Sequence, residues 1–107
     1  MDLVIIESPY AGDTETHIKY LKRAMLDSAG RGEAPFASHL IYTQILDDNI
    51  PGERELGMRM GVAWAFFADK IAVYTDYGIS EGMETMIDLA RAEWAMEVVF
   101  RQIGRNP

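Results

Sequence analysis

Three polar segments of the chain combine residue types that can hold a small ligand. The first runs from Ser8 to Asp13, the second begins near His39, and the third runs from Thr75 to Glu84. The first and third contain glycine and precede predicted helices, so backbone N–H groups and positive helix-dipole ends are available to an anionic or hydroxyl-rich ligand. Neither matches the dinucleotide or P-loop fingerprints. The segments therefore predict a binding site without specifying its ligand.

Two carboxylates of the third segment, Glu81 and Glu84, are candidates for chemistry. Carboxylates act as nucleophiles or stabilise developing positive charge. They also occur at helix starts for structural reasons, where the dipole favours acids by about 0.3–1 kcal/mol. Glu84 could simply share a solvated helix face with Asp88 and Arg91. Ser80 likewise fits a helix N-cap, a ligand contact, or both.

Strands and helices are predicted to alternate along the whole chain, and this order positions the three segments. The predicted elements are a strand at Leu3–Ile6, a helix from Asp13 or Thr14 to Gly30, a strand at Pro35–His39, a helix at Glu53–Asp69, a strand at Lys70–Tyr74, a helix capped by Ser80 that extends through Trp94, and a strand at Met96–Phe100. Such alternation predicts a mainly parallel sheet of four or five strands with right-handed crossovers and helices on both faces. Ligands bind outside the carboxyl ends of such strands, where the three segments meet.

The predicted helix at Glu53–Asp69 carries two notable patterns. Leu56, Met60, Ala63 and Phe67 form one apolar stripe. Gly57 and Gly61 are four residues apart and give a flat face that allows close approach of the sheet or another helix. Further apolar side chains make this helix apolar around much of its circumference, namely Met58, Trp64 and Phe66. We therefore expect some of this surface to meet another subunit.

Composition narrows the classes of protein to which the chain can belong. With 107 residues, 49% hydrophobic and 25% charged, the chain is expected to form one globular domain over residues 1–107. A net charge of −7 argues against binding to a nucleic acid polymer. The chain has no cysteine and no recognisable signal peptide or membrane span, so we expect a cytoplasmic protein. No metal or cofactor is expected, because His17 and His39 lack partners at ligand spacing.

Four stretches together resemble a family of small phage-encoded proteins that is similar to nucleoside 2-deoxyribosyltransferases. The stretches are Ile5–Asp13, Ala34–Leu40, Asp47–Arg54 and Ile79–Met83. The resemblance covers nearly the whole chain. It implies a three-layer Rossmann-like or flavodoxin-like domain, a nucleoside-type ligand and often an oligomeric assembly. It also implies that Gly82-Met83-Glu84 matches the loop that carries the nucleophilic carboxylate of these transferases.

The resemblance implies a role for each candidate residue. Glu84, with Glu81 as its rival, would attack or stabilise the sugar C1′, because displacement of the base passes through an oxocarbenium-like state. Asp76 would position a sugar hydroxyl or the base, and Tyr10 would stack on the base or merely cover the sheet edge. The remaining predicted ligand-binding residues are Ser8, Pro9, Gly12, His39, Gly78, Ser80, Gly82 and Met83. Tyr42 and Gln44 could line the same cleft or cover the core.

Two functional classes are compatible with this pattern, and both use one nucleoside or nucleotide pocket. In the first, the protein transfers or hydrolyses an N-glycosidic bond, as a deoxyribosyltransferase or nucleotide N-glycosidase does. In the second, it is a non-catalytic phage protein that sequesters a host nucleotide immune signal in the host cytoplasm. A structural oligomer with an unused cleft is a third alternative. In each case the expected partners are a small nucleoside-type molecule and further copies of the chain.

Overall fold

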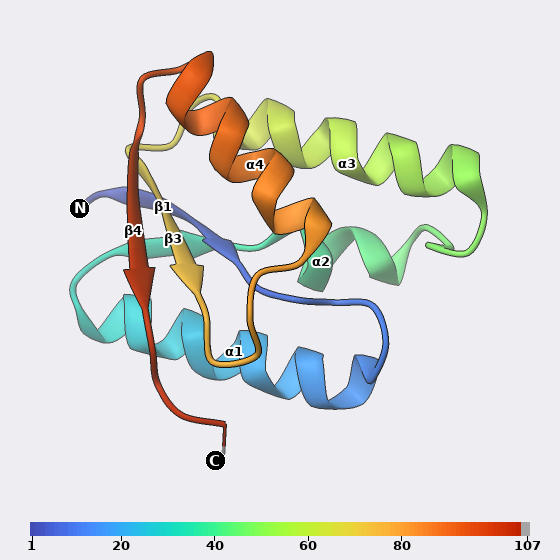
Figure 1. Cartoon of the computed structure of the whole chain (residues 1–107), viewed down its shortest axis with the longest axis horizontal. Helices are drawn as coiled ribbons and strands as arrows, with labels where there is room; N and C mark the ends of the chain where they lie inside the picture. The colour runs from blue at the N-terminus through green and yellow to red at the C-terminus, as the bar shows by residue number, and fades with distance from the viewer. Residues whose placement is uncertain (106–107) are drawn as a thin grey trace.

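The computed structural model describes residues 1–105 and has α/β architecture (Figure 1). Its elements, in chain order, are β1 (Leu3–Glu7), α1 (Thr14–Gly30), β2 (Ala34–Phe36), α2 (Ser38–Ile41), the 3₁₀ turn η1 (Tyr42–Gln44), α3 (Pro51–Ala65), β3 (Lys70–Tyr74), α4 (Glu81–Ala92) and β4 (Glu97–Arg101). The predicted order of strands and helices is confirmed, with one additional short helix after β2. No helix among residues 1–105 is long and apolar enough to cross a bilayer.

The four strands form one sheet in the order β2-β1-β3-β4, and all neighbouring strands are parallel. This order is the first part of the flavodoxin-like sequence of strands, so the predicted fold class is confirmed. Ile5 at the centre of β1 lies beside Phe36 of β2 and Ile71 of β3. The chain moves outward from β1 to β2 and then crosses back to β3. The switch in direction therefore lies between β1 and β3, where the backbones diverge at their carboxyl ends.

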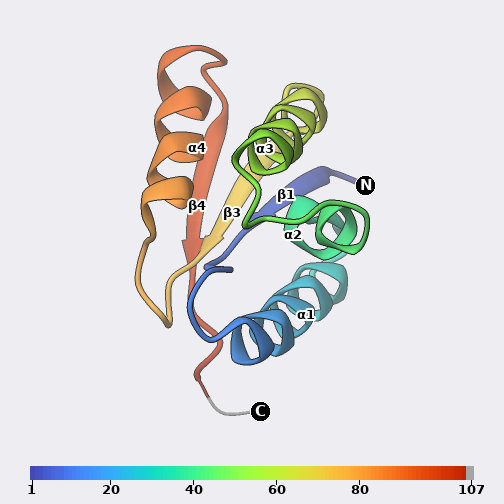
Figure 2. The same cartoon turned by 90° about the vertical axis from the view of Figure 1, so that its right-hand side faces the viewer.

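Helices cover both faces of the sheet and make a three-layer structure (Figure 2). On one face α1 packs through Tyr20, Leu21 and Ala24 against Val4 and Ile6. On the other face α3 and α4 pack against a second cluster that is formed by Ile5, Ala65, Ile71, Val73, Met83, Ile87 and Ala90. Successive residues of a strand point to opposite faces, which is why Val4 and Ile6 belong to one core and Ile5 to the other.

The N-termini of α1 and α4 have the side-chain caps that the sequence predicts. The Asp13 carboxylate accepts a hydrogen bond from the Thr16 N–H at 3.2 Å, and the Ser80 hydroxyl accepts one from the Met83 N–H at 3.3 Å. The Ser80 N–H in turn donates to the Met83 sulfur at 3.3 Å. These bonds satisfy backbone donors that have no partner within the helix. They hold both loops at the carboxyl edge of the sheet.

The second strand is shorter than predicted. The sequence predicts a strand at Pro35–His39, but β2 ends at Phe36 and Ser38 begins α2. Ala37 leaves the sheet and is 1% exposed in the core below α1. The pairing of β2 with β1 ends at Phe36, which lies beside Ile5. His39 consequently lies on a helix and not on a strand.

Helix α3 packs through a different face from its apolar stripe. Gly61 and Ala65 are its buried residues, whereas Leu56 is 40% exposed and Phe67, beyond the end of the helix, is 73% exposed. A Cβ atom built on Gly61 would lie 3.0 Å from the Ser38 hydroxyl oxygen. The glycine face, which was predicted to allow close approach of the sheet or another helix, therefore contacts α2. The prediction that the apolar stripe of Leu56 and Phe67 marks the buried face of this helix was wrong.

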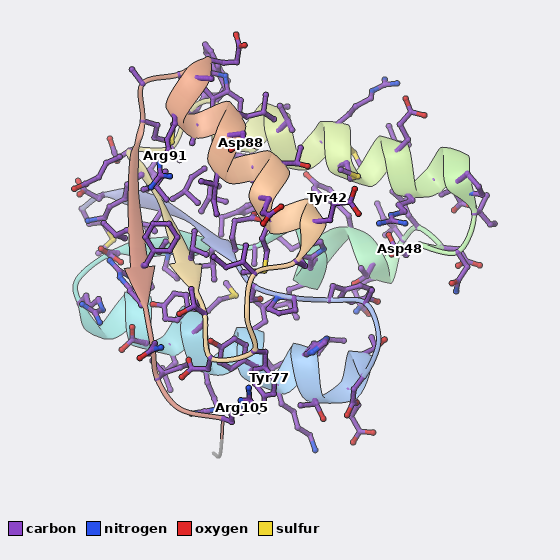
Figure 3. All side chains as sticks on the ribbon, in the orientation of Figure 1. Tyr42, Asp48, Tyr77, Asp88, Arg91 and Arg105 are labelled. Carbon is purple, nitrogen blue, oxygen red and sulfur yellow. The ribbon has the colours of Figure 1, made fainter. Side chains whose placement is uncertain are left out.

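The segment after β4 is fastened to the loop between β3 and α4. The Asp76 carboxylate accepts hydrogen bonds from the Ile103 N–H at 2.8 Å, the Gly104 N–H at 2.7 Å and the Tyr20 hydroxyl at 2.6 Å. Arg105 donates to the Asp76 carbonyl at 2.8 Å, and its guanidinium lies over the Tyr77 ring, as Figure 3 shows. The far end of the described chain is thus held against α1 and the loop after β3.

Candidate functional site

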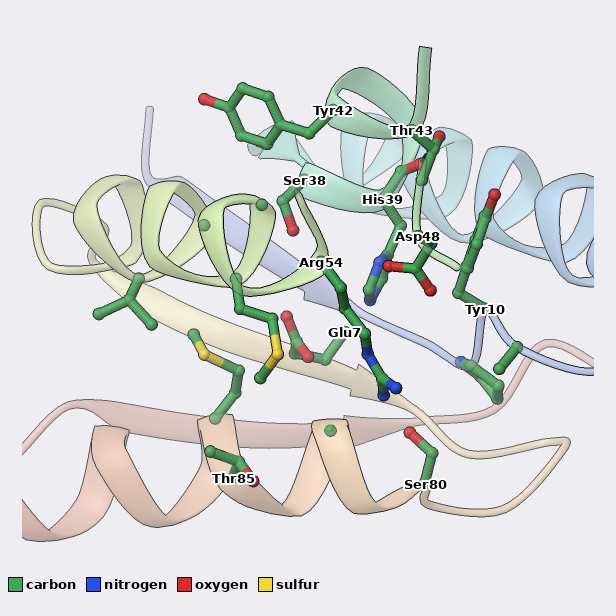
Figure 4. Close-up of a pocket in the computed structure, with 18 of the residues that line it drawn as sticks. Glu7, Tyr10, Ser38, His39, Tyr42, Thr43, Asp48, Arg54, Ser80 and Thr85 are labelled. Carbon is green, nitrogen blue, oxygen red and sulfur yellow. Dashed lines mark hydrogen bonds between the residues drawn. The ribbon is translucent and has the colours of Figure 1, made fainter. Parts of the chain in front are cut away.

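A cavity of about 300 Å³ opens at the carboxyl edge of the sheet, beside the switch between β1 and β3 (Figure 4). This is the place where open α/β sheets bind ligands. Its volume lies at the lower end of the range of small-molecule sites, about 300–1,000 Å³. A compact ligand therefore fits this cavity better than a dinucleotide.

Six parts of the chain supply the walls of the cavity. Its lining includes Ile5 and Glu7 of β1, Pro9 to Ala11 of the first loop, Phe36 to Leu46 in part, Asp48, several residues of α3, and the start of α4. The apolar part comes mainly from Ile5, Phe36, Met58, Val62 and Met86. A mostly apolar wall with a few polar groups is the usual character of a small-molecule site.

Glu7, the last residue of β1, presents its carboxyl group to this cavity (Figure 4). Strand alternation places it on the same sheet face as Ile5, between α3 and α4. The residue is only 5% exposed, and no side chain or backbone group of residues 1–105 forms a hydrogen bond or ion pair with its carboxyl group. Burial raises the pKa of Glu7 to about 8, so the carboxyl group is mostly neutral at pH 7.

Tyr10 and His39 form one side of the cavity mouth. Their rings are stacked with centroids 5.4 Å apart and planes inclined by 12°. The backbone at Tyr10 is held by His17, whose Nδ1 donates to the Tyr10 carbonyl at 3.1 Å. Burial lowers the pKa of His39 and so favours its neutral imidazole. The pair presents a flat, uncharged surface to the cavity, and α2 places His39 there.

Arg54 is the only arginine or lysine among the lining residues. It lies in the first turns of α3, and its guanidinium points into the cavity near Glu7 and Ser80 (Figure 4). One face of α3 supplies both the cation and part of the apolar wall, because helical spacing places Arg54, Met58 and Gly61 or Val62 on the same side of the helix. Four acidic residues also line the cavity, namely Glu7, Asp48, Glu53 and Glu81. The lining therefore carries more acidic than basic groups.

The start of α4 contributes Ser80, Glu81 and Gly82 to the cavity. Glu84, one turn further along, is exposed and does not line it. Met83 is 1% exposed and packs in the core, with its sulfur accepting the Ser80 N–H. Between the two candidate carboxylates, the structure thus places Glu81 at the cavity and Glu84 outside it.

The other predicted site residues are divided between the cavity and its surroundings. Pro9, Tyr10 and His39 line the cavity, as do Tyr42 and Thr43 from the turn after α2. Gly12 and Gln44 line a second, more open hollow that adjoins the cavity at Tyr10 and Asp48.

Ser8, Asp76 and Gly78 lie outside the cavity lining. Ser8 points away from Glu7 by strand alternation, is 1% exposed, and its hydroxyl oxygen has no hydrogen-bond partner among residues 1–105. Gly78 has φ +84° and donates to the Thr75 carbonyl within a turn. The pKa of Asp76 is held below its usual value, because the hydrogen bonds it accepts outweigh the opposing effect of burial. None of these three residues contributes to the cavity, and their predicted ligand contacts stay predictions.

Comparison with protein families identifies the chain. The model of the family described as "Domain of unknown function (DUF7768)" matches residues 2–101. The chain belongs to the DUF7768 family. No curated protein matches it, and no solved structure does. Within the described part of this DUF7768 domain, no group of three or more histidine, cysteine, aspartate and glutamate residues is arranged to hold a metal ion.

The sequence analysis of this DUF7768 domain missed Glu7 and Arg54 as candidate site residues. A signal for Glu7 does exist, because it is an acid that directly follows four apolar residues of a buried strand and shares a face with Ile5. Arg54 has no comparable local signal, since exposed arginines are common on helices. Only the approach of α3 to the end of β1 brings it to the cavity.

Proposed function

We propose that this DUF7768 protein binds a nucleoside-type small molecule in the cavity at the carboxyl edge of its sheet. The observation that supports the proposal most directly is the position of the cavity, which lies beside the switch between β1 and β3 where such folds bind ligands. The resemblance to nucleoside 2-deoxyribosyltransferases points to the same ligand class. The aromatic and apolar lining is suited to a flat heterocycle, and the polar mouth to a sugar.

The charges around the cavity favour a nucleoside or a nucleoside monophosphate over a polyphosphate. Arg54 and the N-terminus of α4 are available for one anionic or hydroxyl group. Asp48, Glu53 and Glu81 would repel further phosphates. We therefore expect binding to weaken as phosphate groups are added to the ligand.

For the catalytic alternative we assign the nucleophile to Glu81 and not to Glu84. A nucleophilic carboxylate must reach C1′, and of the two candidates only Glu81 lines the cavity. Its oxygen would bond to C1′ as the C1′–N bond breaks and the base leaves. Water would then attack C1′ as the bond between C1′ and the Glu81 oxygen breaks, which frees the carboxylate. The OH of the water stays on C1′ and its other proton passes to the departed base, so that hydrolysis consumes one water and releases sugar and free base.

The exposed position of Glu84 favours a second candidate function, which is binding without chemistry. The carboxylate matched by the resemblance lies outside the cavity, which supports a binder that has kept the pocket of the family it resembles. A phage protein of this kind would sequester a host nucleotide immune signal and release it unchanged.

One experiment separates these functions. Wild type, Glu81→Gln and Glu84→Gln are incubated with deoxynucleosides, ribonucleosides, their mono- and triphosphates, and cyclic or ADP-ribose-type nucleotides. Thermal stabilisation reports binding and chromatography reports released base. Base release that is lost in Glu81→Gln but kept in Glu84→Gln supports the enzyme. Stabilisation with the ligand recovered intact from all three proteins supports the binder, and no stabilisation by any ligand contradicts both.

We also propose that the protein self-associates through the apolar surface around the end of α3. Trp64, Phe66 and Phe67 are 55%, 59% and 73% exposed in the single chain. The Phe66 ring packs edge-on against both Phe67 and Trp94, so these three side chains form one continuous surface, whereas the Trp64 ring packs on Phe36 and donates to the Tyr42 hydroxyl. Neighbouring large exposed apolar side chains are typical of surfaces that meet another protein chain.

A further inference from the structure

Glu7 is buried without a partner at the inner end of the cavity, although a carboxyl group is costly to bury. The residue is 5% exposed and lines the cavity, and its carboxyl group takes part in no hydrogen bond or ion pair among residues 1–105. Glu33, the other buried glutamate, is surrounded by Arg101, Lys70 and Ser28. A buried polar group that lacks a partner in the protein calls for an explanation, and an absent ligand is one.

The surroundings of Glu7 favour a neutral carboxyl group. Its neighbours on the same sheet face are the apolar cluster of Ile5, and the cavity lining from α3 and α4 includes Met58, Val62 and Met86. Arg54 points into the same cavity without forming an ion pair with Glu7. A neutral carboxyl group offers one donor, its O–H, beside one acceptor, its C=O.

We infer that Glu7, as a neutral carboxyl group, recognises the base of the ligand through an edge that places a hydrogen-bond acceptor beside a donor. The Glu7 O–H would donate to a ring nitrogen, and its C=O would accept from the adjacent amino group. Adenine and cytosine both present such an edge. An edge with two adjacent donors suits an ionised carboxylate instead. This inference rests on the proposed function and names the part of the ligand that enters the cavity first.

The pH dependence of binding is a direct consequence. The titratable and charged groups that face Glu7 across the cavity are His39 of α2, Asp48 of the following loop, Glu53 and Arg54 of α3, Glu81 of α4, and the hydroxyls of Tyr10 and Tyr42. Burial lowers the pKa of His39, so the titration of this residue moves away from the alkaline range in which Glu7 is expected to ionise. Ionisation of Glu7 in this range would remove its donor and weaken binding of an adenine or cytosine nucleoside.

The test is calorimetric titration of adenosine and cytidine into wild type, Glu7→Gln, Glu7→Ala and Glu55→Gln at pH 6.5 and 9.5. Purine riboside lacks the amino group of adenosine, so comparing the two ligands tests whether this amino group donates a hydrogen bond to Glu7. The glutamine side chain does not ionise, but its amide keeps an acceptor, the C=O, beside a donor, the NH₂ group. Glu55 lies on the exposed part of α3 outside the cavity, so Glu55→Gln controls for the loss of one charge. Thermal unfolding of each variant shows that it is folded.

We expect wild type and Glu55→Gln to bind at least one of the two nucleosides about tenfold more weakly at pH 9.5 than at pH 6.5. Glu7→Gln should bind within a few-fold of wild type at pH 6.5 and show no pH dependence. Glu7→Ala should lose roughly tenfold or more, and with it the preference for adenosine over purine riboside.

Three results would overturn the inference. Wild-type affinity that rises with pH, together with weak binding by Glu7→Gln, would mean that Glu7 acts as an anion. Binding by folded Glu7→Ala equal to that of wild type would remove Glu7 from recognition and leave the proposed function intact. Binding of neither adenosine nor cytidine excludes the edge assigned here, and binding of no nucleoside at all also ends the proposed function.

Discussion

Glu7 and Glu33 are both buried glutamates, but their surroundings set opposite protonation states. Glu33 accepts two hydrogen bonds from Arg101, each of 2.8 Å, and one from Ser28, also of 2.8 Å. These bonds, with the Lys70 ammonium at 2.9 Å, hold its pKa well below the usual value. Glu7 has no such partners, and burial alone raises its pKa to about 8. Glu33 therefore stabilises the fold as an anion, whereas Glu7 suits a ligand site.

Replacing Glu7 by glutamine should stabilise the protein in a pH-dependent way. The folded state keeps the Glu7 proton up to about pH 8, whereas the unfolded state releases it near 4.5, so wild-type stability falls as pH rises through this window. The advantage of Glu7→Gln over wild type should grow by about 3 kcal/mol between pH 4 and pH 7. Urea unfolding at both pH values measures it. A constant difference would show that Glu7 ionises normally.

Replacing Glu33 by glutamine should have the opposite effect. The substitution leaves the buried Arg101 guanidinium without its ion-pair partner, and breaking such a pair costs about 3–5 kcal/mol. Because the folded pKa of Glu33 is depressed, its stabilisation is present above about pH 4.5 and is lost as pH falls through the folded value. The deficit of Glu33→Gln in urea unfolding should therefore shrink from pH 7 to pH 3. Glu15→Gln, which removes the exposed pair with Lys19, should change stability little.

At the scale of elements, the contact between α2 and α3 shapes the cavity. Gly61 lets α3 approach Ser38 so closely that a Cβ atom would lie 3.0 Å from the Ser38 oxygen. Both helices carry lining residues, including His39 and Arg54. The spacing of Gly57 and Gly61 predicted a close approach, but not which element would make it. A helix face without side chains can meet a sheet, a helix or another subunit, so the partner depends on the rest of the fold.

Replacing Gly61 by valine should therefore force α2 and α3 apart. We expect a loss of about 1–3 kcal/mol beyond that of Gly52→Val, because crowding in a packed contact costs this much. Gly52 is the matched control, since a Cβ atom there meets nothing within 4 Å. Thermal or urea unfolding measures stability, and nucleoside titration measures the affinity of the cavity for its ligand. An equal change in stability of both variants would reflect backbone propensity alone, and would contradict a packing role for Gly61.

At the scale of the whole molecule, the apolar surface at the end of α3 stays exposed to solvent in a single chain. We expect self-association through Trp64, Phe66 and Phe67, measured as mass by light scattering after size-exclusion chromatography. Phe67→Ser should lower the mass toward that of the 12.1 kDa monomer. Leu26 of α1 is 74% exposed and lies apart from this surface, so Leu26→Ser should leave the mass unchanged. A wild-type monomer at high concentration would contradict this expectation.

The sequence by itself determined the order of strands and helices, the parallel sheet and the caps at Asp13 and Ser80. These features depend on periodicity and on contacts between residues close in the chain, which a sequence displays directly. The location of a site at the carboxyl edge follows from the same pattern, and the structure places a cavity there.

Only the tertiary structure decided which side chains share the cavity. It places Glu81 inside and Glu84 outside, joins Asp76 to the segment after β4, and brings Arg54 to the end of β1. It also leaves the Glu7 carboxyl group facing the cavity without a hydrogen-bond partner among residues 1–105. Each outcome depends on packing between segments far apart in the chain. Periodicity predicts which way a residue faces within its own element, but the neighbours on that face come from how the elements pack.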